Sequence, residues 1–219
     1  PAATWPKGAM LEVKEWDTGK PLGKIAQVEN TYSVVGNMNE HQVAITESTF
    51  GGRHELVDTT GIMDYGSLIY IALQRSKSAR EAIKVMTDLV KEYGYYSSGE
   101  TFSIADKNEA WVMEMIGKGP GNKGAVWVAI RIPDDCISAH ANQSRIQQIP
   151  FDDKENCIYS PDVVSFAREK GYFKGKDSDF SFAKAYCPYD FSALRGCEAR
   201  VWSFFRKYDT TMRSEERRV

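Results

Sequence analysis

The chain has 219 residues, of which 42% are hydrophobic and 12% aromatic, and this composition excludes a disordered protein. The formal net charge is -2 and the isoelectric point is about 6.0, so we expect neither a nucleic-acid partner nor binding to an anionic membrane. The longest apolar run, around residues 68–73, is too short to cross a bilayer. The sequence leaves the compartment open, since cytoplasmic and exported proteins both have such a composition.

Residues 11–52 alternate between apolar and polar side chains and are rich in Val, Ile, Thr and Tyr. Gly, Asn and Asp interrupt them, so the pattern predicts an antiparallel meander. Two strand-like runs flank a turn at Asn37–Glu40, to which we assign a structural role. The second run ends in Glu47-Ser48-Thr49 and then Gly51-Gly52. Such a strand end is either the polar tip of a hairpin or the edge of an active site.

The hydrophobic period then changes to that of a helix. Ser78 and Glu81 have the spacing of a capping box, in which the Ser hydroxyl accepts from the Glu backbone N–H and the Glu side chain reaches back. An apolar face follows, and Gly94 is a favourable residue to end the helix. These signals predict a helix over residues 78–93, preceded by a shorter helix over 66–75.

Residues 101–117 return to strand patterns, in two runs joined by the turn Asp106–Glu109, and predict a β-hairpin. The glycine-rich residues 117–124 lack the spacing of a phosphate-binding loop. They lead to a further predicted strand at 125–133. Residues 136–143 predict another extended stretch that ends in polar side chains.

Pro161 favours the first turn of a helix that runs from Ser160 to Gly171. A last helix is predicted at about residues 191–208. Strands and helices therefore follow one another in blocks rather than in strict alternation. This order predicts an α+β fold with mainly antiparallel sheets.

The four cysteines form no C-x-x-C pair, and the three histidines are too few for an obvious metal cage, so we expect no metal and no cofactor. His41, His54 and His140 are interpreted as surface or hydrogen-bonded structural residues. Cys136 and His140 lie too far apart in a strand to bond each other. Cys136 is therefore predicted to be a buried strand residue rather than a nucleophile. The cysteines are Cys136, Cys157, Cys187 and Cys197.

Three segments resemble the dipeptidase family of cysteine-type N-terminal-nucleophile hydrolases, to which the secernins are related. These segments are GNMNEHQVAITEST, TFSIADKNEAWVMEMIGKGP and VWVAIRIPDDCISAHANQSRI. The hairpin FSIADKNEAWVMEMIG is the most specific of the matching pieces. The resemblance covers roughly residues 1–208, and it implies one domain there with a tail at 209–219.

The resemblance implies a four-layer αββα sandwich. It also implies a nucleophilic Cys at the mature N-terminus, whose own α-amine acts as the base because its pKa lies near working pH. The sequence begins at Pro1, and no Cys precedes it. We therefore expect these residues to lack the first strand and the nucleophile, and to be inactive alone. An exposed sheet edge would then favour a homo-oligomer.

The resemblance also assigns roles to particular residues. Asn142 matches the Asn that helps to form the oxyanion hole, although without the resemblance a turn residue is the favoured interpretation. Glu47 matches another active-site polar position, and Arg200 matches the Arg that supports the nucleophile. Thr49, on the polar strand end, is assigned to substrate binding. The predicted function is hydrolysis of small unblocked dipeptides; the alternatives are a non-catalytic binding relative or an amidase on another small amide.

Overall fold

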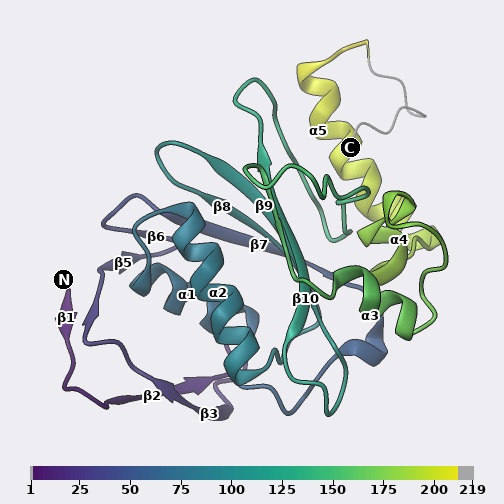
Figure 1. Cartoon of the computed structure of the whole chain (residues 1–219). Helices are drawn as coiled ribbons and strands as arrows, with labels where there is room; N and C mark the ends of the chain where they lie inside the picture. The colour runs from purple at the N-terminus through teal and green to yellow at the C-terminus, as the bar shows by residue number, and fades with distance from the viewer. Residues whose placement is uncertain (1, 212–219) are drawn as a thin grey trace.

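A seven-stranded antiparallel sheet forms the centre of the computed structural model, which describes residues 2–211 (Figure 1). The strands lie in the order β11-β10-β9-β8-β7-β6-β5. Consecutive strands along the chain are antiparallel neighbours throughout this sheet. The strands are β5 (Val34–Val35), β6 (Met38–Asn39), β7 (Ala44–Gly51), β8 (Gly99–Ala105), β9 (Ala110–Gly117), β10 (Ala125–Ile132) and β11 (Cys157–Tyr159).

The middle of the sheet is buried on both faces. In β9, Trp111, Met113 and Met115 pack into one apolar cluster, while Val112 and Ile116 pack into a second cluster on the opposite face. Alternate residues of a strand point to opposite faces, so this run fills two cores at once. Helices α1 (Tyr65–Arg75) and α2 (Ala79–Tyr93) cover the first face, and α3 (Val163–Glu169) and α4 (Phe182–Tyr186) contribute to the second (Figure 1).

The two predicted helices on the first face are confirmed. Ser78 caps α2, and its hydroxyl accepts from the Glu81 backbone N–H at 3.2 Å. The Glu81 carboxylate instead accepts from the Lys77 backbone N–H at 2.7 Å, one residue before the expected partner. Gly94 ends α2 with a φ of 81°, which a glycine adopts without strain.

The predicted meander of residues 11–52 is divided over three sheets. Strand β1 (Ala3–Thr4) pairs with β4 (Asn30–Thr31), and β2 (Met10–Lys14) pairs with β3 (Pro21–Ala26). Only the part from β5 onward joins the main sheet. The cause is tertiary, since Val13 and Ile25 of the β2–β3 ribbon pack into the cluster under α1 and α2.

The predicted hairpin of β8 and β9 and the strand β10 are confirmed, but the extended stretch at 136–143 forms no strand. The short strand β11 takes the edge of β10 that this stretch would need, with Ala129 opposite Ile158. Cys136 is therefore exposed in a loop, and the prediction that it is a buried strand residue is wrong.

The C-terminal helices follow the prediction with shifted boundaries. Helix α3 begins at Val163, two residues after Pro161, because residues 160–162 form a cap and turn. The last predicted helix consists of a π-helical segment (Ala193–Glu198) followed by α5 (Ala199–Tyr208). Two short 3₁₀ turns lie at His54–Leu56 and Asp177–Asp179. Of the predicted tail, residues 212–219 lie outside the described part.

The observed architecture is mixed α+β with one large antiparallel sheet and helices on both faces. Two two-stranded pieces complete the sheets that residues 2–211 show. The four-layer sandwich stays a prediction. Across the same residues, none of the helices is long and apolar enough to cross a membrane.

Asn39→Ala is expected to lower the free energy of unfolding by about 1–3 kcal/mol, because it leaves buried backbone groups without partners. Asn39 is 5% exposed; its Nδ2 donates to the Leu73 and Ser76 carbonyls, and its Oδ1 accepts from the His41 and Val43 backbone N–H groups.

Urea unfolding measures the effect on stability. The control is Asn122→Ala, at an exposed loop position that should shift the free energy of unfolding by less than about 0.5 kcal/mol. Equal losses in the two variants would contradict the role given to Asn39.

Candidate functional site

The polar end of β7 is held in an irregular conformation. The register with β8 shifts between Thr49 and Gly51, so Phe50 forms a β-bulge. Gly51 and Gly52 follow with φ values of 71° and 74°. A Cβ on Gly52 would lie 2.8 Å from the Tyr186 carbonyl oxygen. Glycine has no Cβ and so avoids this clash. The strand therefore ends in a fixed bend rather than in a mobile hairpin tip.

Two carboxylates and a hydroxyl share the face of this strand end that is turned toward α1 and α2. Thr49 lies opposite Glu100 of β8, and its hydroxyl donates to Glu100 Oε1 at 2.7 Å. Glu100 is 1% exposed, and its Oε2 has no hydrogen-bond partner within the described residues. Burial, followed by the hydrogen bond and charge of the nearby Glu47 carboxylate, raises the pKa of Glu100 to about 9, against the opposing effect of the Thr49 hydrogen bond.

Asn142 reaches the same strand end from a loop. Its backbone N–H donates to Ser48 Oγ at 2.8 Å, and its Nδ2 donates to the Thr49 carbonyl at 2.7 Å. Its φ is 55°, in the left-handed region that Asn tolerates better than most residues. Arg200 donates from Nη2 to Asn142 Oδ1 at 3.0 Å, which fixes the orientation of the amide. The second hydrogen of Nδ2 is thus available to another acceptor.

A buried carboxylate anchors the loop that carries Asn142. Glu114, in the middle of β9, is 0% exposed and accepts from the Ser144 hydroxyl and from the Arg145 and Ile146 backbone N–H groups. Burial raises its pKa to about 7, against the opposing effect of these hydrogen bonds. Glu114 was not predicted to have a role, although a single charge inside the apolar run WVMEMIG is a signal for one.

Arg200 joins the C-terminal helix to this loop. Besides the Asn142 amide, its Nη2 donates to the Ala141 carbonyl at 3.1 Å. Two residues earlier, Glu198 forms an ion pair with Arg145. The structure therefore brings Arg200, Asn142 and Thr49 into one hydrogen-bonded chain, with Glu47 beside its end.

Two cavities flank the strand end. The acidic cavity has a volume of about 370 Å³, and its lining includes Glu15, Asp17, Thr49, Asp64, Tyr65 and Glu100. The cysteine-lined cavity has a volume of about 400 Å³ and lies on the Asn142 side. Its lining includes Phe50, Gly52, Asn142, Gln143, Cys187 and Cys197.

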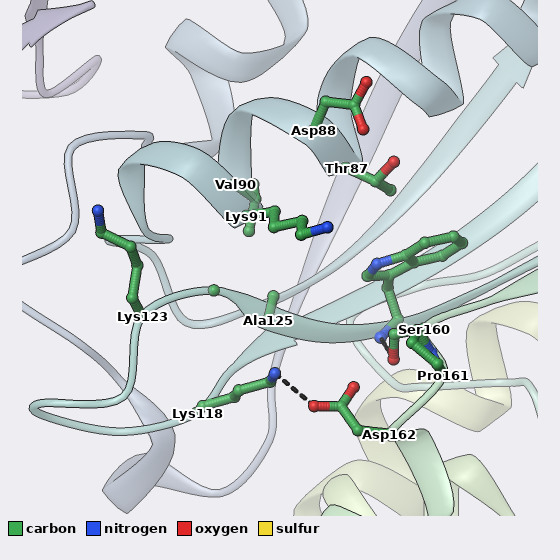
Figure 2. Close-up of a pocket in the computed structure, with 12 residues that line it drawn as sticks. Thr87, Asp88, Val90, Lys91, Lys118, Lys123, Ala125, Ser160, Pro161 and Asp162 are labelled. Atoms are coloured by element: carbon green, nitrogen blue, oxygen red, sulfur yellow. Dashed lines mark hydrogen bonds and ion pairs between the residues drawn. The ribbon is translucent and has the colours of Figure 1, made fainter.

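A third cavity of about 400 Å³ lies between α2 and β10, away from the predicted site residues. Figure 2 shows Lys91 on α2 above the strand and Lys118 below it, where the Lys118 ammonium meets the Asp162 carboxylate at 2.5 Å. None of the predicted site residues lines this lysine-lined cavity.

The histidines do not contribute to the strand end as a catalytic set. His140 Nε2 lies 2.8 Å from Ser103 Oγ, which confirms a hydrogen-bonded structural role, and burial lowers its pKa. The Cys136 thiol donates to Asp135 Oδ1 at 3.6 Å rather than to His140. Among residues 2–211, no three His, Cys, Asp or Glu side chains are grouped to hold a metal ion.

Comparison with known proteins gives one family. The family model described as "Peptidase family C69" matches residues 1–218. A probable dipeptidase of Salmonella dublin is 29% identical over 174 residues, which cover 76% of this chain and 38% of the relative. A probable dipeptidase of Latilactobacillus sakei is 31% identical over 155 residues, covering 68% of this chain and 31% of the relative.

A probable dipeptidase B of Streptococcus pyogenes serotype M1 is 33% identical over 122 residues, which cover 56% of this chain and 23% of the relative. The chain thus spans less than two-fifths of the length of these relatives.

Glu100→Gln is expected to weaken the pH dependence of stability between about pH 4.5 and 9. Since folding raises the pKa from 4.5 to about 9, the folded state keeps a proton that the unfolded state loses, and the free energy of unfolding falls as pH rises through this window. Below pH 4.5 both states are protonated and the group contributes nothing. The free energy of unfolding should fall more steeply with pH in the wild type than in the variant, by up to about 1.4 kcal/mol per pH unit.

Urea unfolding at several pH values measures both slopes. The exposed Glu169→Gln serves as the control and should follow the wild type. Parallel curves for Glu100→Gln and wild type would show that Glu100 is not buried with a raised pKa.

Proposed function

The chain belongs to peptidase family C69, whose members are cysteine-type dipeptidases, and we propose that its protein hydrolyses unblocked dipeptides at the polar end of β7. The observation that carries this proposal is the placement of Asn142. Its amide is held between Thr49 and Arg200 with one N–H left to donate. A fixed amide donor of this kind stabilises the oxyanion that forms when a thiol attacks a peptide carbonyl.

The other predicted residues receive roles that fit their positions. Arg200 is a positioning residue, since it holds the Asn142 amide from the carbonyl side. Thr49 contacts Asn142 and also lines the acidic cavity, and it binds substrate between them. Glu47 supplies a negative charge beside Glu100, and this charge attracts the amine end of the substrate.

We assign the nucleophile to a cysteine at the mature N-terminus. Beyond Ala44, within residues 2–211, no strand pairs with β7 on the side opposite β8, so an N-terminal strand can lie beside Thr49. Internal thiols are less suitable. Burial raises the pKa of Cys157 to about 11 and that of Cys187 above its ordinary value. Desolvation and the Asp135 carboxylate raise the pKa of Cys136.

The reaction then has two steps. The N-terminal thiol loses its proton to the adjacent α-amine, and the sulfur bonds to the carbonyl carbon while Asn142 stabilises the oxyanion. The tetrahedral intermediate collapses, the proton passes to the leaving amine, and the second amino acid departs. Water then cleaves the thioester and releases the first amino acid with the thiol restored.

The proposal is tested with a panel of free dipeptides and the protein bearing its mature N-terminus, with and without iodoacetamide. We expect turnover that iodoacetamide abolishes, and no turnover by a polypeptide of residues 1–219 alone. Binding without turnover would favour a non-catalytic relative instead. Turnover of other small amides but not of dipeptides would favour an amidase.

Asn142→Gly is expected to lower kcat by about 10²–10³-fold, because it removes an oxyanion donor. Glycine tolerates the positive φ at this position, so the backbone should be retained. Steady-state hydrolysis of L-alanyl-L-alanine measures the loss, and the melting temperature checks the fold. Asn122→Gly, in an exposed loop with positive-φ glycines on each side of its turn, is the matched control. An unchanged kcat in Asn142→Gly would remove Asn142 from the mechanism.

A further inference from the structure

The acidic cavity has an unusual charge composition. Four carboxylates line it, from Glu15, Asp17, Asp64 and Glu100, and its lining contains no Lys or Arg. The pKa of Tyr65, which also lines it, is raised by burial and by Asp17, Glu47 and Glu100. The Glu15, Asp17 and Asp64 carboxylates therefore give the cavity a negative potential, which favours a cation.

Three of the four carboxylates are occupied by structural contacts. Asp64 caps α1 by accepting from the Ser67 backbone N–H at 3.0 Å, and it also accepts from the Trp16 backbone N–H. Asp17 accepts from the Tyr65 hydroxyl at 2.9 Å. Glu15 accepts from the Thr18 hydroxyl. Their charges remain, but their geometry is set by the fold.

Glu100 differs from these three. It is 1% exposed, and only its Oε1 is used, by Thr49. Its Oε2 is buried without a donor among residues 2–211. A buried acceptor without a donor costs about 1–3 kcal/mol, so a ligand that brings an N–H group to this oxygen removes a penalty present in the empty cavity.

We infer that the acidic cavity binds the α-ammonium group of the substrate, with Glu100 Oε2 as its principal acceptor. This inference rests on the proposed function, since it names the end of the dipeptide that the cavity receives. An ammonium offers three N–H donors and a positive charge, which meet the open oxygen and the potential together. A metal ion fits less well, because the described residues contain no group of three metal-binding side chains.

The position of the cavity agrees with the proposed reaction centre. Thr49 connects the two sites: its carbonyl accepts from Asn142, and its hydroxyl donates to Glu100. In a dipeptide the α-ammonium and the peptide carbonyl both belong to the first residue and lie about 3.5 Å apart. Its ammonium can therefore lie at Glu100 while its peptide carbonyl faces Asn142. Substrates with an acetylated amine keep one N–H donor but lose the positive charge that the cavity favours.

The test compares L-alanyl-L-alanine with N-acetyl-L-alanyl-L-alanine as substrates of the mature protein. In Glu100→Gln we expect kcat/KM for the free dipeptide to fall at least 10-fold, mainly through KM, and that for the acetylated dipeptide to stay the same or rise. Gln keeps the shape and the Thr49 contact but cannot ionise, so it cannot form an ion pair with the ammonium. Glu169→Gln should leave both values and their ratio unchanged.

The outcomes distinguish failure of this inference from failure of the proposed function. Failure to hydrolyse either substrate would contradict the proposed function. Turnover of the free dipeptide with an unchanged preference in folded Glu100→Gln would overturn the inference and leave the function standing. If Glu100→Gln does not fold, the same comparison is made with Asp17→Asn, which changes an exposed residue of the cavity lining. A preference for the free amine reduced about 3-fold or more supports the inference, and an unchanged preference contradicts it.

Discussion

The buried carboxylate of Glu114 is the constraint on which the site depends. It satisfies three donors of residues 144–146 and so holds their loop against the sheet. Two residues before this anchor, Asn142 meets Ser48 and Thr49. The anchor is costly, since burial in the middle of β9 raises its pKa to about 7. Removing one partner of such a network leaves buried polar groups without partners, which explains why a carboxylate is kept inside an apolar strand.

The sheet places two environments on opposite sides of one strand end. Glu100 is buried on the face that α1 and α2 cover, and the cavity that it lines there is acidic. The C-terminal helix borders the other side, where Arg200 and Asn142 are exposed to solvent. The bulge at Phe50 and the two glycines after it fix the strand end between them. A substrate lying across Thr49 would therefore meet a cation-binding site at one end and an amide donor near its middle.

Much of the fold could be predicted because its signals are local. Helix α2 follows from the Ser78 cap and an apolar face, and the β8–β9 hairpin follows from alternation and a turn. The stretch at 136–143 was wrongly predicted, since competition with β11 for an edge is a long-range effect. The family resemblance indicated Asn142, Arg200, Glu47 and Thr49. Glu100 and Glu114 were missed because their roles depend on burial and on partners distant in sequence.

A crystal structure of the mature protein, with its N-terminal nucleophile replaced by alanine and L-alanyl-L-alanine bound, tests the placement of the substrate most directly. We expect the ammonium nitrogen within about 3 Å of Glu100 and the peptide carbonyl oxygen within about 3 Å of Asn142 Nδ2. A dipeptide bound in the lysine-lined or the cysteine-lined cavity, with Glu100 Oε2 still lacking a donor, would contradict this placement.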